Sequence, residues 1–467
     1  MDSCQYESMT ISTELLQRFD IAGPRYTSYP TADRFVEAFG ESQYVDALRQ
    51  RGHSARSHAF PLSVYVHIPF CASLCYYCAC NKIITHQYSK AISYLESLRQ
   101  EVSLLSPYLG EGNKVSQLHL GGGTPTFLRD PELKSLMKML SETFSWQAGG
   151  EYSIEVDPRT VDGHRLGMLK ELGFNRLSLG VQDFDPVVQK AVHREQSFEQ
   201  VQTLMQHAAA LGFSSLNLDL IYGLPMQTLP SWAQTMKSIV QLRPERIALY
   251  AYAHLPARFK PQRHILADDI PTAGMKTDML TMALEQLQAA GYIYIGMDHF
   301  ALPEDALAIA KRQGRLHRNF QGYTTQPDCD LIGLGVSSIG NIGASYQQNV
   351  KVMADYQDIL AQGRLPVERG IALTRDDLLR RHVIMAIMCQ GYVSYESVEL
   401  SYLIHFKQYF RAELELLVDI QEQGLVKMNG GSLEVTADGW FVVRAIAMVF
   451  DRYLQLDQHR TRFSKII

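Results

Sequence analysis

The sequence has few of the features that mark secreted, membrane-spanning or nucleic-acid-binding proteins. Cysteines number only seven in 467 residues, and 44 Lys and Arg face 49 Asp and Glu, for a formal net charge of −5. Because the chain has no excess of positive charge, we do not expect it to bind nucleic acid by neutralising phosphates. No apolar run is long enough to span a bilayer, and the start, Met1–Glu7, lacks a cationic stretch followed by an apolar one. We therefore expect a cytoplasmic protein that acts on a small molecule.

The few cysteines are unevenly placed along the chain. Four of them lie in one short run: Cys71, Cys75, Cys78 and Cys80. A disulfide framework would spread its pairs along the chain, and a reducing cytosol would not maintain it. Clustered thiols in such a protein are typical of metal ligands or redox groups. Of the isolated cysteines, we interpret Cys329 and Cys389 as small buried apolar side chains.

Short β-rich runs alternate with longer amphipathic runs between Leu62 and about Leu302. The predicted strands are Ser63–Pro69, Val115–Leu120, Tyr152–Val156, Arg176–Val181, Leu216–Ile221, Arg246–Tyr252 and Tyr292–Met297. The predicted helices, whose apolar residues recur at spacings of three and four, are Ala91–Leu105, Glu132–Phe144, Phe198–Leu211, Trp232–Leu242 and Thr277–Ala290. Repeated βα units with nearly continuous apolar strands predict an α/β fold, in which helices cover a parallel sheet that is doubly wound or closes towards a barrel.

Polar or glycine-rich groups follow one predicted strand after another. They are Pro69–Cys71, Gly121–Thr124, Glu155–Pro158, Gln182–Phe184 and Asp219–Gly223. In parallel α/β folds the functional site forms at the carboxyl ends of the strands. We expect these groups to converge on one mouth of the sheet.

The alternation stops after about Leu302. Residues His317–Gly340 are rich in Gly, Thr, Ser and aromatics, which predicts a functional loop or lid. From about Leu373 the pattern is mostly helical, with one short β-like stretch near Gly431–Val435. We predict an N-terminal arm (1–61), a βα-repeat barrel (62–302), a loop-rich connection that contributes to the site (303–372) and a helical C-terminal domain (373–467).

Cys71, Cys75 and Cys78 have the spacing C-x3-C-x2-C in a loop just after a predicted strand. A short loop with three thiolates can wrap three irons of a [4Fe–4S] cluster and leave the fourth iron open. An open iron can chelate the amino and carboxylate groups of S-adenosylmethionine and deliver an electron to its sulfonium. The alternative is a zinc site that also uses Cys80, but zinc ligands usually come in pairs from two separate segments, and no later Cys/His pair has that spacing.

The motif and its position after the first strand of a βα series resemble the radical S-adenosylmethionine (SAM) superfamily. Further segments are similar to the family of oxygen-independent coproporphyrinogen III oxidases over nearly the whole chain. These segments are Arg25–Pro30, Tyr65–Cys71, Gly121–Thr126, Gly180–Phe184, His299–Phe300 and Asn319–Thr325. The resemblance implies a partial (β/α)6 barrel with parallel strands, an N-terminal arm and a smaller, mainly helical C-terminal domain.

The resemblance also implies an activity. Two propionate side chains of coproporphyrinogen III would be oxidatively decarboxylated to vinyl groups without oxygen, giving protoporphyrinogen IX in haem biosynthesis. The agent would be a 5′-deoxyadenosyl radical. The implied cofactors are one [4Fe–4S] cluster and two molecules of SAM, and the implied electron donor is a flavodoxin or ferredoxin. We expect a monomer without a nucleic-acid partner or membrane span.

Two further radical SAM functions stay open as alternatives. One is a haem-carrying paralogue, a haem chaperone, and the other is a haem-degrading methyltransferase. Haem carriers of this kind generally lack both the Arg25–Pro30 segment and a cysteine equivalent to Cys80, and this chain has both. The resemblance therefore favours the oxidase.

Single residues take roles from the resemblance. Cys71, Cys75 and Cys78 would bind the cluster, and Cys80 would be catalytic. The residues that would contact SAM are Tyr65, Tyr77, Gly122, Gly123, Thr124, Glu155, Gln182, Arg194, Asp219, Ala253 and Ile339. For each polar residue taken singly, the alternative is a satisfied side chain at a strand end.

The implied substrate carries four propionates, which guanidinium groups suit well. Arg25 and Arg318 are therefore candidate substrate clamps, although either would serve equally as a salt-bridge residue. Tyr26, Tyr29 and Tyr323 are candidates for stacking on pyrroles, with ordinary packing as the alternative.

Overall fold

A computed structural model of the chain describes residues 18–19, 21–54, 60–110, 113–326 and 329–456. Met1–Glu7 lies outside the described residues. The chain divides into two compact units, each assembled from separate segments. The barrel unit comprises Asp33–Pro271 and Asp328–Leu373, and the composite unit comprises Met1–Ala32, Thr272–Pro327 and Thr374–Ile467. The four-part division made from the sequence stays a prediction.

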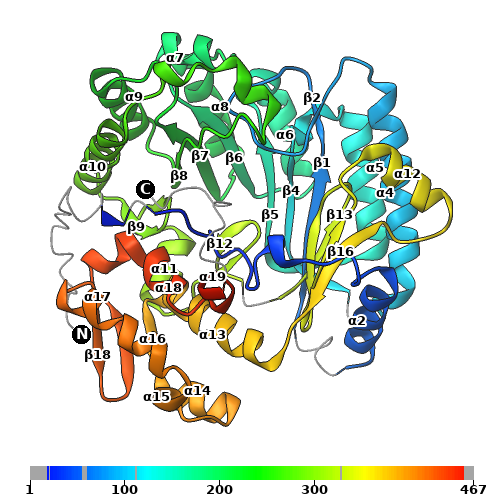
Figure 1. Ribbon diagram of the computed structural model, residues 1–467. Coiled ribbons are helices and arrows are strands. Elements are labelled where there is room, and N and C mark those ends of the chain that lie inside the picture. The colour runs from blue at the N-terminus through cyan, green and yellow to red at the C-terminus, as the bar shows by residue number, and fades with distance from the viewer. Residues whose placement is uncertain (1–17, 20, 55–59, 111–112, 327–328, 457–467) are drawn as a thin grey trace. The chain divides into compact units, whose positions relative to one another are not determined.

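The barrel unit is built on six parallel strands that follow one another in the sheet in chain order (Figure 1). They are β1 (Leu62–Ile68), β4 (Lys114–Gly122), β5 (Ser145–Val156), β6 (Arg176–Gln182), β7 (Ser215–Tyr222) and β8 (Arg246–Ala251). A doubly wound sheet would reverse its strand order at a switch point, and this one does not. The sheet is therefore the partial barrel and not the doubly wound alternative.

Six helices connect these strands. They are α4 (Ser89–Leu105), α5 (Asp130–Thr143), α6 (Gly163–Glu171), α7 (Pro186–Ala191), α8 (Phe198–Ala210) and α9 (Leu229–Leu242). Helix α9 begins after Thr228, whose hydroxyl accepts from Ser231 N, and it buries Trp232, Met236 and Ile239 along one face. The predictions of α4, α5, α8 and α9 are confirmed, whereas α6 and α7 are too short for their periodicity to be read.

Four further strands extend the sheet beyond β1. They are β13 (Asp330–Leu334), β14 (Ile339–Ile342), β15 (Ser345–Asn349) and β16 (Val367–Ala372). Strand β13 is parallel to β1, and the other three are antiparallel to their neighbours. The prediction of one loop or lid over His317–Gly340 was therefore wrong. Glycines suggested a loop, but Gly333 lies where a Cβ would come 2.5 Å from the Ile339 carbonyl oxygen, so close strand packing requires it.

The composite unit is mainly helical, with short antiparallel strand pairs. Its helices are α10 (Ala273–Ala289), α11 (Ala306–Arg312), α13 (Arg375–Gln390), α14 (Tyr395–Tyr402), α15 (Phe406–Tyr409), α16 (Arg411–Leu416), α17 (Val418–Glu422), α18 (Val443–Met448) and α19 (Arg452–Leu456). Its strands are β9 (Ile293–Gly296), β10 (His299–Ala301), β11 (His317–Asn319), β12 (Gly322–Thr324), β17 (Tyr392–Ser394), β18 (Val426–Asn429) and β19 (Ser432–Val435).

One strand prediction for this unit needs correction, and another is confirmed. Strand β9 forms an antiparallel pair with β10, so the stretch Tyr292–Met297 does not continue the parallel series. The β-like stretch near Gly431–Val435 is β19, and it is the middle strand of a three-stranded sheet with β17 and β18. No helix among the described residues has the length and apolar character needed to cross a membrane.

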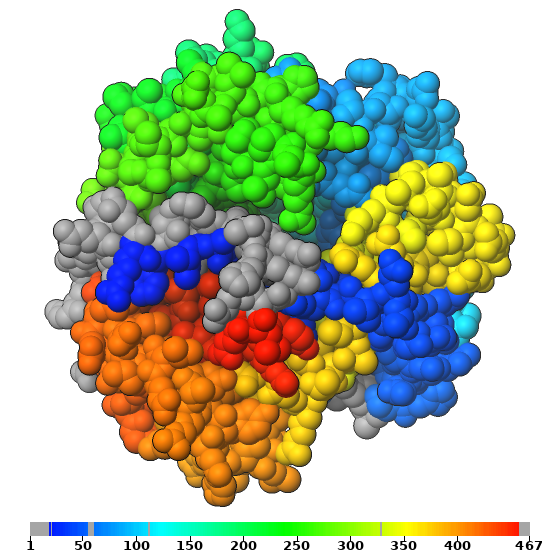
Figure 2. Space-filling view, in the orientation of Figure 1, coloured from blue at the N-terminus to red at the C-terminus, as the bar shows by residue number. Residues whose placement is uncertain are grey.

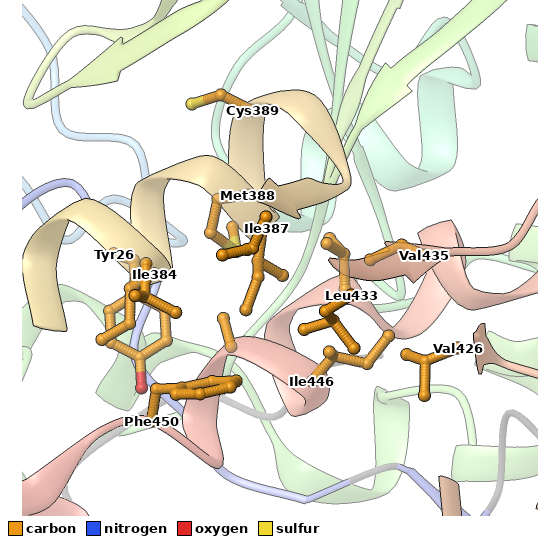
Figure 3. Packing of buried hydrophobic residues seen from close by; sticks show 14 of the residues in the cluster. Tyr26, Ile384, Ile387, Met388, Cys389, Val426, Leu433, Val435, Ile446 and Phe450 are labelled. Carbon is orange, nitrogen blue, oxygen red and sulfur yellow. The ribbon is translucent and has the colours of Figure 1, made fainter. Parts of the chain in front are cut away.

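The core of the composite unit joins segments that are far apart in the sequence. Figure 3 shows Ile387 and Met388 of α13 packed with Leu433 of β19 and Ile446 of α18, all at most 1% exposed. Figure 2 shows the described N-terminal residues of this unit, in blue, beside its red C-terminal residues. A hydrogen bond of 3.1 Å from Arg444 Nε to the Pro24 carbonyl ties these two ends together.

The tyrosines proposed as stacking partners belong to this core. Tyr26 and Tyr29 are fully buried, and Tyr323 is 7% exposed. The Tyr26 hydroxyl donates to Asp451 Oδ2 at 2.9 Å, and the Tyr323 hydroxyl donates to the Met388 carbonyl at 2.9 Å. Packing, and not pyrrole stacking, is therefore their observed role.

The isolated cysteines differ from each other. Cys389 is 3% exposed in the core of the composite unit, which confirms the prediction of a buried apolar side chain. Cys329 is only half-buried, and its sulfur lies 3.8 Å from Ser116 Oγ. The same prediction was therefore wrong for Cys329.

Candidate cofactor site

Three cysteines of the barrel unit lie on one loop at the carboxyl end of β1. Cys71 ends the short strand β2 (Phe70–Cys71), and the loop returns through β3 (Ile83–Ile84), which is parallel to β2. Cys75 is buried, and Cys71 and Cys78 are half-buried. Burial raises the pKa of Cys71 to about 11, and the nearby Cys78 and Cys75 add to this effect. Cys75 and Cys78 thus lie close enough to Cys71 to contribute to its raised pKa.

Cys78 and Cys80 differ in ionisation because of a hydrogen bond between them. This bond lowers the pKa of Cys78 to about 6 and raises the pKa of Cys80 well above its ordinary value. Lys82 also favours the Cys78 thiolate, and its Nζ donates to the Cys78 carbonyl at 3.0 Å. Near neutral pH, Cys78 is therefore a thiolate, the form that binds metal, whereas the exposed Cys80 keeps its proton.

The glycine-rich turn after β4 brings main chain close to the cysteine loop. Gly122 has a φ of +115°, and its N–H donates to Glu155 Oε2 at 3.1 Å. A Cβ at Gly123 would lie 2.8 Å from the Phe70 carbonyl oxygen, so only glycine fits this approach. Thr124 Oγ1 donates to Cys71 Sγ at 3.4 Å. The turn therefore contacts a cysteine sulfur directly.

Two carboxylates from neighbouring strands are held in different states. Burial alone would raise the pKa of Glu155, but His119 Nε2 at 3.2 Å and the Gly122 N–H hold it below its usual range. Burial and the charge of Glu155 raise the pKa of Asp219 to about 6. Asp219 accepts from Ser178 Oγ at 3.0 Å and from Asn217 Nδ2 at 2.9 Å. Glu155 is thus an anion at neutral pH, whereas Asp219 changes its protonation state at a pH just below neutrality.

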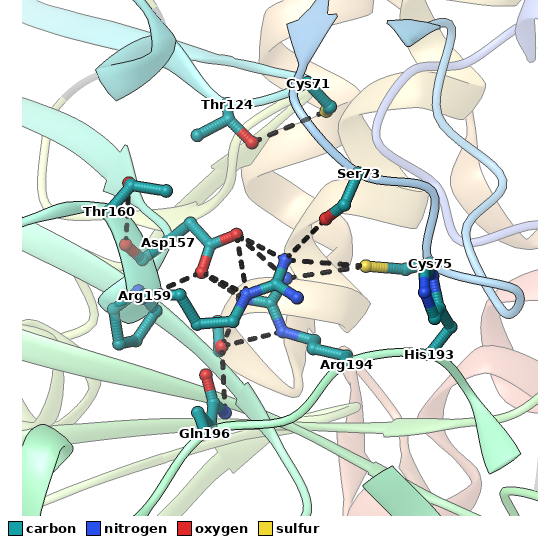
Figure 4. Close-up of polar contacts among 12 residues, drawn as sticks. Cys71, Ser73, Cys75, Thr124, Asp157, Arg159, Thr160, His193, Arg194 and Gln196 are labelled. Carbon is teal, nitrogen blue, oxygen red and sulfur yellow. Dashed lines mark hydrogen bonds and ion pairs between the residues drawn. The ribbon is translucent and has the colours of Figure 1, made fainter. Parts of the chain in front are cut away.

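A pair of arginines shares one aspartate beside Cys75 (Figure 4). Arg194 Nη1 lies 3.6 Å from Cys75 Sγ and 3.4 Å from Asp157 Oδ2, and Arg194 Nη2 donates to the Gly180 carbonyl at 2.6 Å. Arg159 Nη2 donates to Asp157 Oδ2 at 2.7 Å. Burial alone would raise the pKa of Asp157, but the two guanidinium groups hold it below its usual value.

The other predicted cofactor residues of the barrel unit lie inside a strand, at strand ends or in loops that follow them. The Tyr65 hydroxyl is 3.0 Å from His67 Nδ1, and its ring stacks on His119 at 5.9 Å between centroids. Gln182 ends β6 with a φ of +70°, and Ile339 begins β14. The carbonyls of Tyr77 and Ala253 both accept from Gln262 Nε2, each at 3.1 Å. This shared donor links the cysteine loop to the segment after β8.

The predicted substrate residues Arg25 and Arg318 belong to the composite unit. Arg25 pairs with Asp298, and Arg318 Nε donates to the Arg25 carbonyl at 3.2 Å. The Arg318 guanidinium lies over the Tyr323 ring at 4.6 Å. The two arginines therefore meet, although they are far apart in the sequence.

Sequence reasoning missed four polar residues of the site: His67, His119, Asp157 and Arg159. Each histidine lies inside a strand, where a single histidine carries no signal of its own. Asp157 was noticed only as part of a polar strand end, and Arg159 lies in the short turn Pro158–Thr160 that follows. The contacts that Arg159 makes with the cysteine loop depend on the position of the end of β5 beside that loop, which the sequence does not reveal.

The donor set of the loop suits an iron–sulfur cluster. It offers three thiols at the spacing of the motif, and Thr124 and Arg194 direct hydrogen-bond donors at two of the sulfurs. Among the residues that the structure describes, however, no three His, Cys, Asp or Glu side chains are grouped so that they could hold a metal ion, so the cluster assignment rests on the spacing of the motif and on these donors.

Comparisons with known proteins agree with this chemistry. The family model of the Radical SAM superfamily matches residues 65–239, and that of the HemN C-terminal domain matches residues 373–442. Two curated relatives, each named oxygen-independent coproporphyrinogen III oxidase, come from Pseudomonas aeruginosa and Escherichia coli. Each is 48% identical to this chain over 97% of its length and 98% of their own.

A solved structure is similar over almost the whole chain. It is the coproporphyrinogen III oxidase (HemN) from Escherichia coli, described as a radical SAM enzyme. It superposes with a TM-score of 0.90 at 47% identity and covers 96% of this chain and 100% of its own. The likeness therefore extends through both units.

Proposed function

Since the chain belongs to the oxygen-independent coproporphyrinogen III oxidase family of the radical SAM superfamily, we propose that it converts coproporphyrinogen III to protoporphyrinogen IX. It is a radical SAM oxidoreductase of haem biosynthesis, and it decarboxylates two propionates to vinyl groups without oxygen. The observation that carries this proposal is the three-cysteine loop beside Arg194 and Glu155 at the carboxyl end of the parallel sheet. We place the reaction in the cytoplasm, in a monomer that receives electrons from a flavodoxin or ferredoxin.

Cys71, Cys75 and Cys78 would hold one [4Fe–4S] cluster and leave one iron for SAM. When bound, these groups supply the electron and the 5′-deoxyadenosyl radical that removes a hydrogen from the β-carbon of a propionate. The protein holds and orients the cofactor. The Gly123 and Thr124 main chain would contact the methionine end of SAM, because glycine allows close approach there.

The polar strand ends would orient the rest of SAM. Arg194 would pair with the methionine carboxylate through its guanidinium fork. Glu155, an anion at neutral pH, would accept from the ammonium, and Asp219 and Gln182 would bind the ribose hydroxyls. Tyr65 and Ala253 would line the same site.

A second SAM molecule would lie beside the first. The residues proposed to contact it are Tyr77, Gly123, Thr124 and Ile339. Cys80 would act next to it as a proton donor, which its exposed and protonated thiol suits.

The arginines of the composite unit would hold propionates of the substrate. Arg318 is 8% exposed, and its buried Nη1 has no hydrogen-bond partner among the described residues. Burial, together with the nearby Arg25 and Arg318 cations, lowers the pKa of Arg444 to about 10. Arg318 and Arg444 are buried, whereas the Arg25 side chain is 33% exposed and pairs with Asp298. One carboxylate beside three cations leaves room for a further anion. A propionate on Arg25 and Arg318 would supply that charge.

The test is an anaerobic assay with coproporphyrinogen III, SAM and a strong one-electron reductant. About two SAM should be consumed per substrate, because each propionate needs its own hydrogen abstraction. Methionine, 5′-deoxyadenosine and protoporphyrinogen IX should rise together. If the protein cleaves SAM without making a vinyl product and instead binds haem stoichiometrically with a Soret band, it is a haem carrier.

A further inference from the structure

Arg159 is held rigidly against the cysteine loop by contacts on both sides. Asp157 Oδ1 accepts from the Arg159 backbone N–H at 3.1 Å and from its Nε at 3.0 Å. On the other side, Arg159 Nη2 donates to Ser73 Oγ at 3.2 Å and lies 4.0 Å from Cys75 Sγ (Figure 4). The side chain thus bridges the end of β5 and the loop that carries the cluster ligands.

The carboxylate that Arg159 uses is already shared. Asp157 also pairs with Arg194, with 3.3 Å between Oδ1 and Nη2. Two guanidinium cations and one carboxylate leave a net positive charge beside Cys75. These side chains are shielded from water, at 8% exposure for Asp157, 9% for Arg194 and 21% for Arg159, so the charge is only weakly screened.

The two arginines are not equivalent towards the cofactors. Arg194 is the one proposed to pair with the carboxylate of SAM, and that pairing would neutralise its charge. Arg159 is directed at Ser73 and Cys75 of the loop itself. Its N–H donor therefore stays directed at the cysteine loop whether or not SAM is bound.

We propose that Arg159 is a positioning residue for the cluster, which places a fixed positive charge and an N–H donor at Cys75 and so favours one-electron reduction. The step adds one electron from a donor to the [4Fe–4S]2+ cluster and gives [4Fe–4S]+, and no bond in the protein forms or breaks. Net charge and hydrogen bonds to the sulfurs are general determinants of cluster potential. The inference rests on the cluster assignment of the proposed function.

The test is an anaerobic redox titration of the reconstituted, cluster-loaded protein, followed by electron paramagnetic resonance with dithionite as the one-electron reductant. In Arg159→Gln the equilibrium constant for reduction of the cluster should fall about tenfold. This corresponds to a midpoint potential that is lower by about 59 mV for a one-electron couple. Arg159→Lys keeps the charge and should stay within about twofold of wild type. Lys138→Gln removes an exposed cation on α5 and is the matched control, with an unchanged potential.

Each outcome decides between the alternatives. Equal potentials in Arg159→Gln and wild type, with the cluster intact, would overturn the inference. If Arg159→Gln loses the cluster while Arg159→Lys retains it, the requirement for the charge is supported. If both variants lose the cluster, Arg159 acts by packing against the loop and not through its charge, and the inference fails. Failure of the wild-type protein to bind a cluster would instead refute the proposed function.

Discussion

At the scale of single residues, Cys78 and Cys80 show how two identical side chains can take different tasks. The hydrogen bond between them makes Cys78 the thiolate and leaves the proton on Cys80. The C-x3-C-x2-C spacing predicts the ligand set without Cys80, and this assignment stays a prediction. The sequence could not reveal the hydrogen bond, because it depends on the local path of the loop.

Serine substitutions should separate the ligands from Cys80. Cys71→Ser, Cys75→Ser and Cys78→Ser should each prevent assembly of the [4Fe–4S] cluster, as measured by iron content and electron paramagnetic resonance. Cys80→Ser should keep the cluster and SAM binding but lower turnover by about 100-fold or more, because it removes a proton donor. A loss of iron from Cys80→Ser would make Cys80 a ligand instead.

Asp219 should make SAM binding depend on pH. Because its pKa in the protein is about 6, the carboxylate is charged above that pH and becomes neutral below it. The affinity for SAM should therefore rise with pH through about 6 and level off above 7, since the charged form accepts hydrogen bonds more strongly.

Anaerobic calorimetric titrations of SAM between pH 5.5 and 8 would measure this dependence. Asp219→Asn should bind SAM more weakly at pH 8 and lose most of the pH dependence. An unchanged pH profile in this variant would show that another group is responsible.

At the scale of elements, long periodic helices and apolar strands were predictable, and elements shaped by close packing were not. Strands β1 and β4 to β8 appear within a few residues of their predicted positions, apart from β5, which begins earlier. Strands β13 and β14 were taken for part of a loop because the glycines that permit their close approach also occur in loops. The antiparallel hairpin of β9 and β10 was hidden because a strand run does not reveal the direction of its partner.

One buried carboxylate on α4 binds residues from three other parts of the barrel unit. Glu101 on α4 accepts from Gly335 N after β13 at 2.7 Å, from Asn349 Nδ2 of β15 at 2.6 Å and from the Tyr356 hydroxyl of α12 (Met353–Ala361) at 2.6 Å. Burial raises its pKa to about 7 in spite of these donors. The carboxyl is therefore partly protonated at neutral pH.

This shift predicts how stability depends on pH. A pKa that is raised on folding, here from about 4.3 in the unfolded chain, stabilises the fold fully below the unfolded value and less as pH rises through 7. Relative to Glu101→Gln, which does not titrate, the free energy of unfolding of wild type should fall by about 3 kcal/mol between pH 4 and pH 8. Denaturant titrations at several pH values would measure this difference.

A matched control lies on the same helix. Glu96 has a side chain that is 71% exposed, so Glu96→Gln removes a carboxylate from the same helix without changing a buried group. Glu101→Ala should be destabilised at every pH, because three donors lose their acceptor. A constant difference between wild type and Glu101→Gln across the range would contradict the raised pKa.

At the scale of the whole molecule, the chain is organised as two units with separate cores. We expect two transitions in scanning calorimetry. Binding of the cluster should raise the transition temperature of the barrel unit, because a ligand that binds only the folded state stabilises that state. The transition of the composite unit should move little.

A core substitution tests the assignment of the two transitions. Ile446→Ala leaves a cavity in the composite unit and should lower the free energy of unfolding of that unit by about 2 to 5 kcal/mol. The transition temperature of the composite unit should fall, and that of the barrel unit should not change. A single transition that shifts as a whole in both experiments would show that the units unfold together.

The interleaving of the two units also bears on how the protein is made. The last segment of the barrel unit ends at Leu373, whereas the core of the composite unit needs α13 and α18, which come later in the chain. During translation, the ribosome therefore releases the complete barrel unit before the composite unit can close its core. We therefore expect the cysteine loop to be available for iron delivery on a nascent chain, while residues 272–327 await α13 and α18.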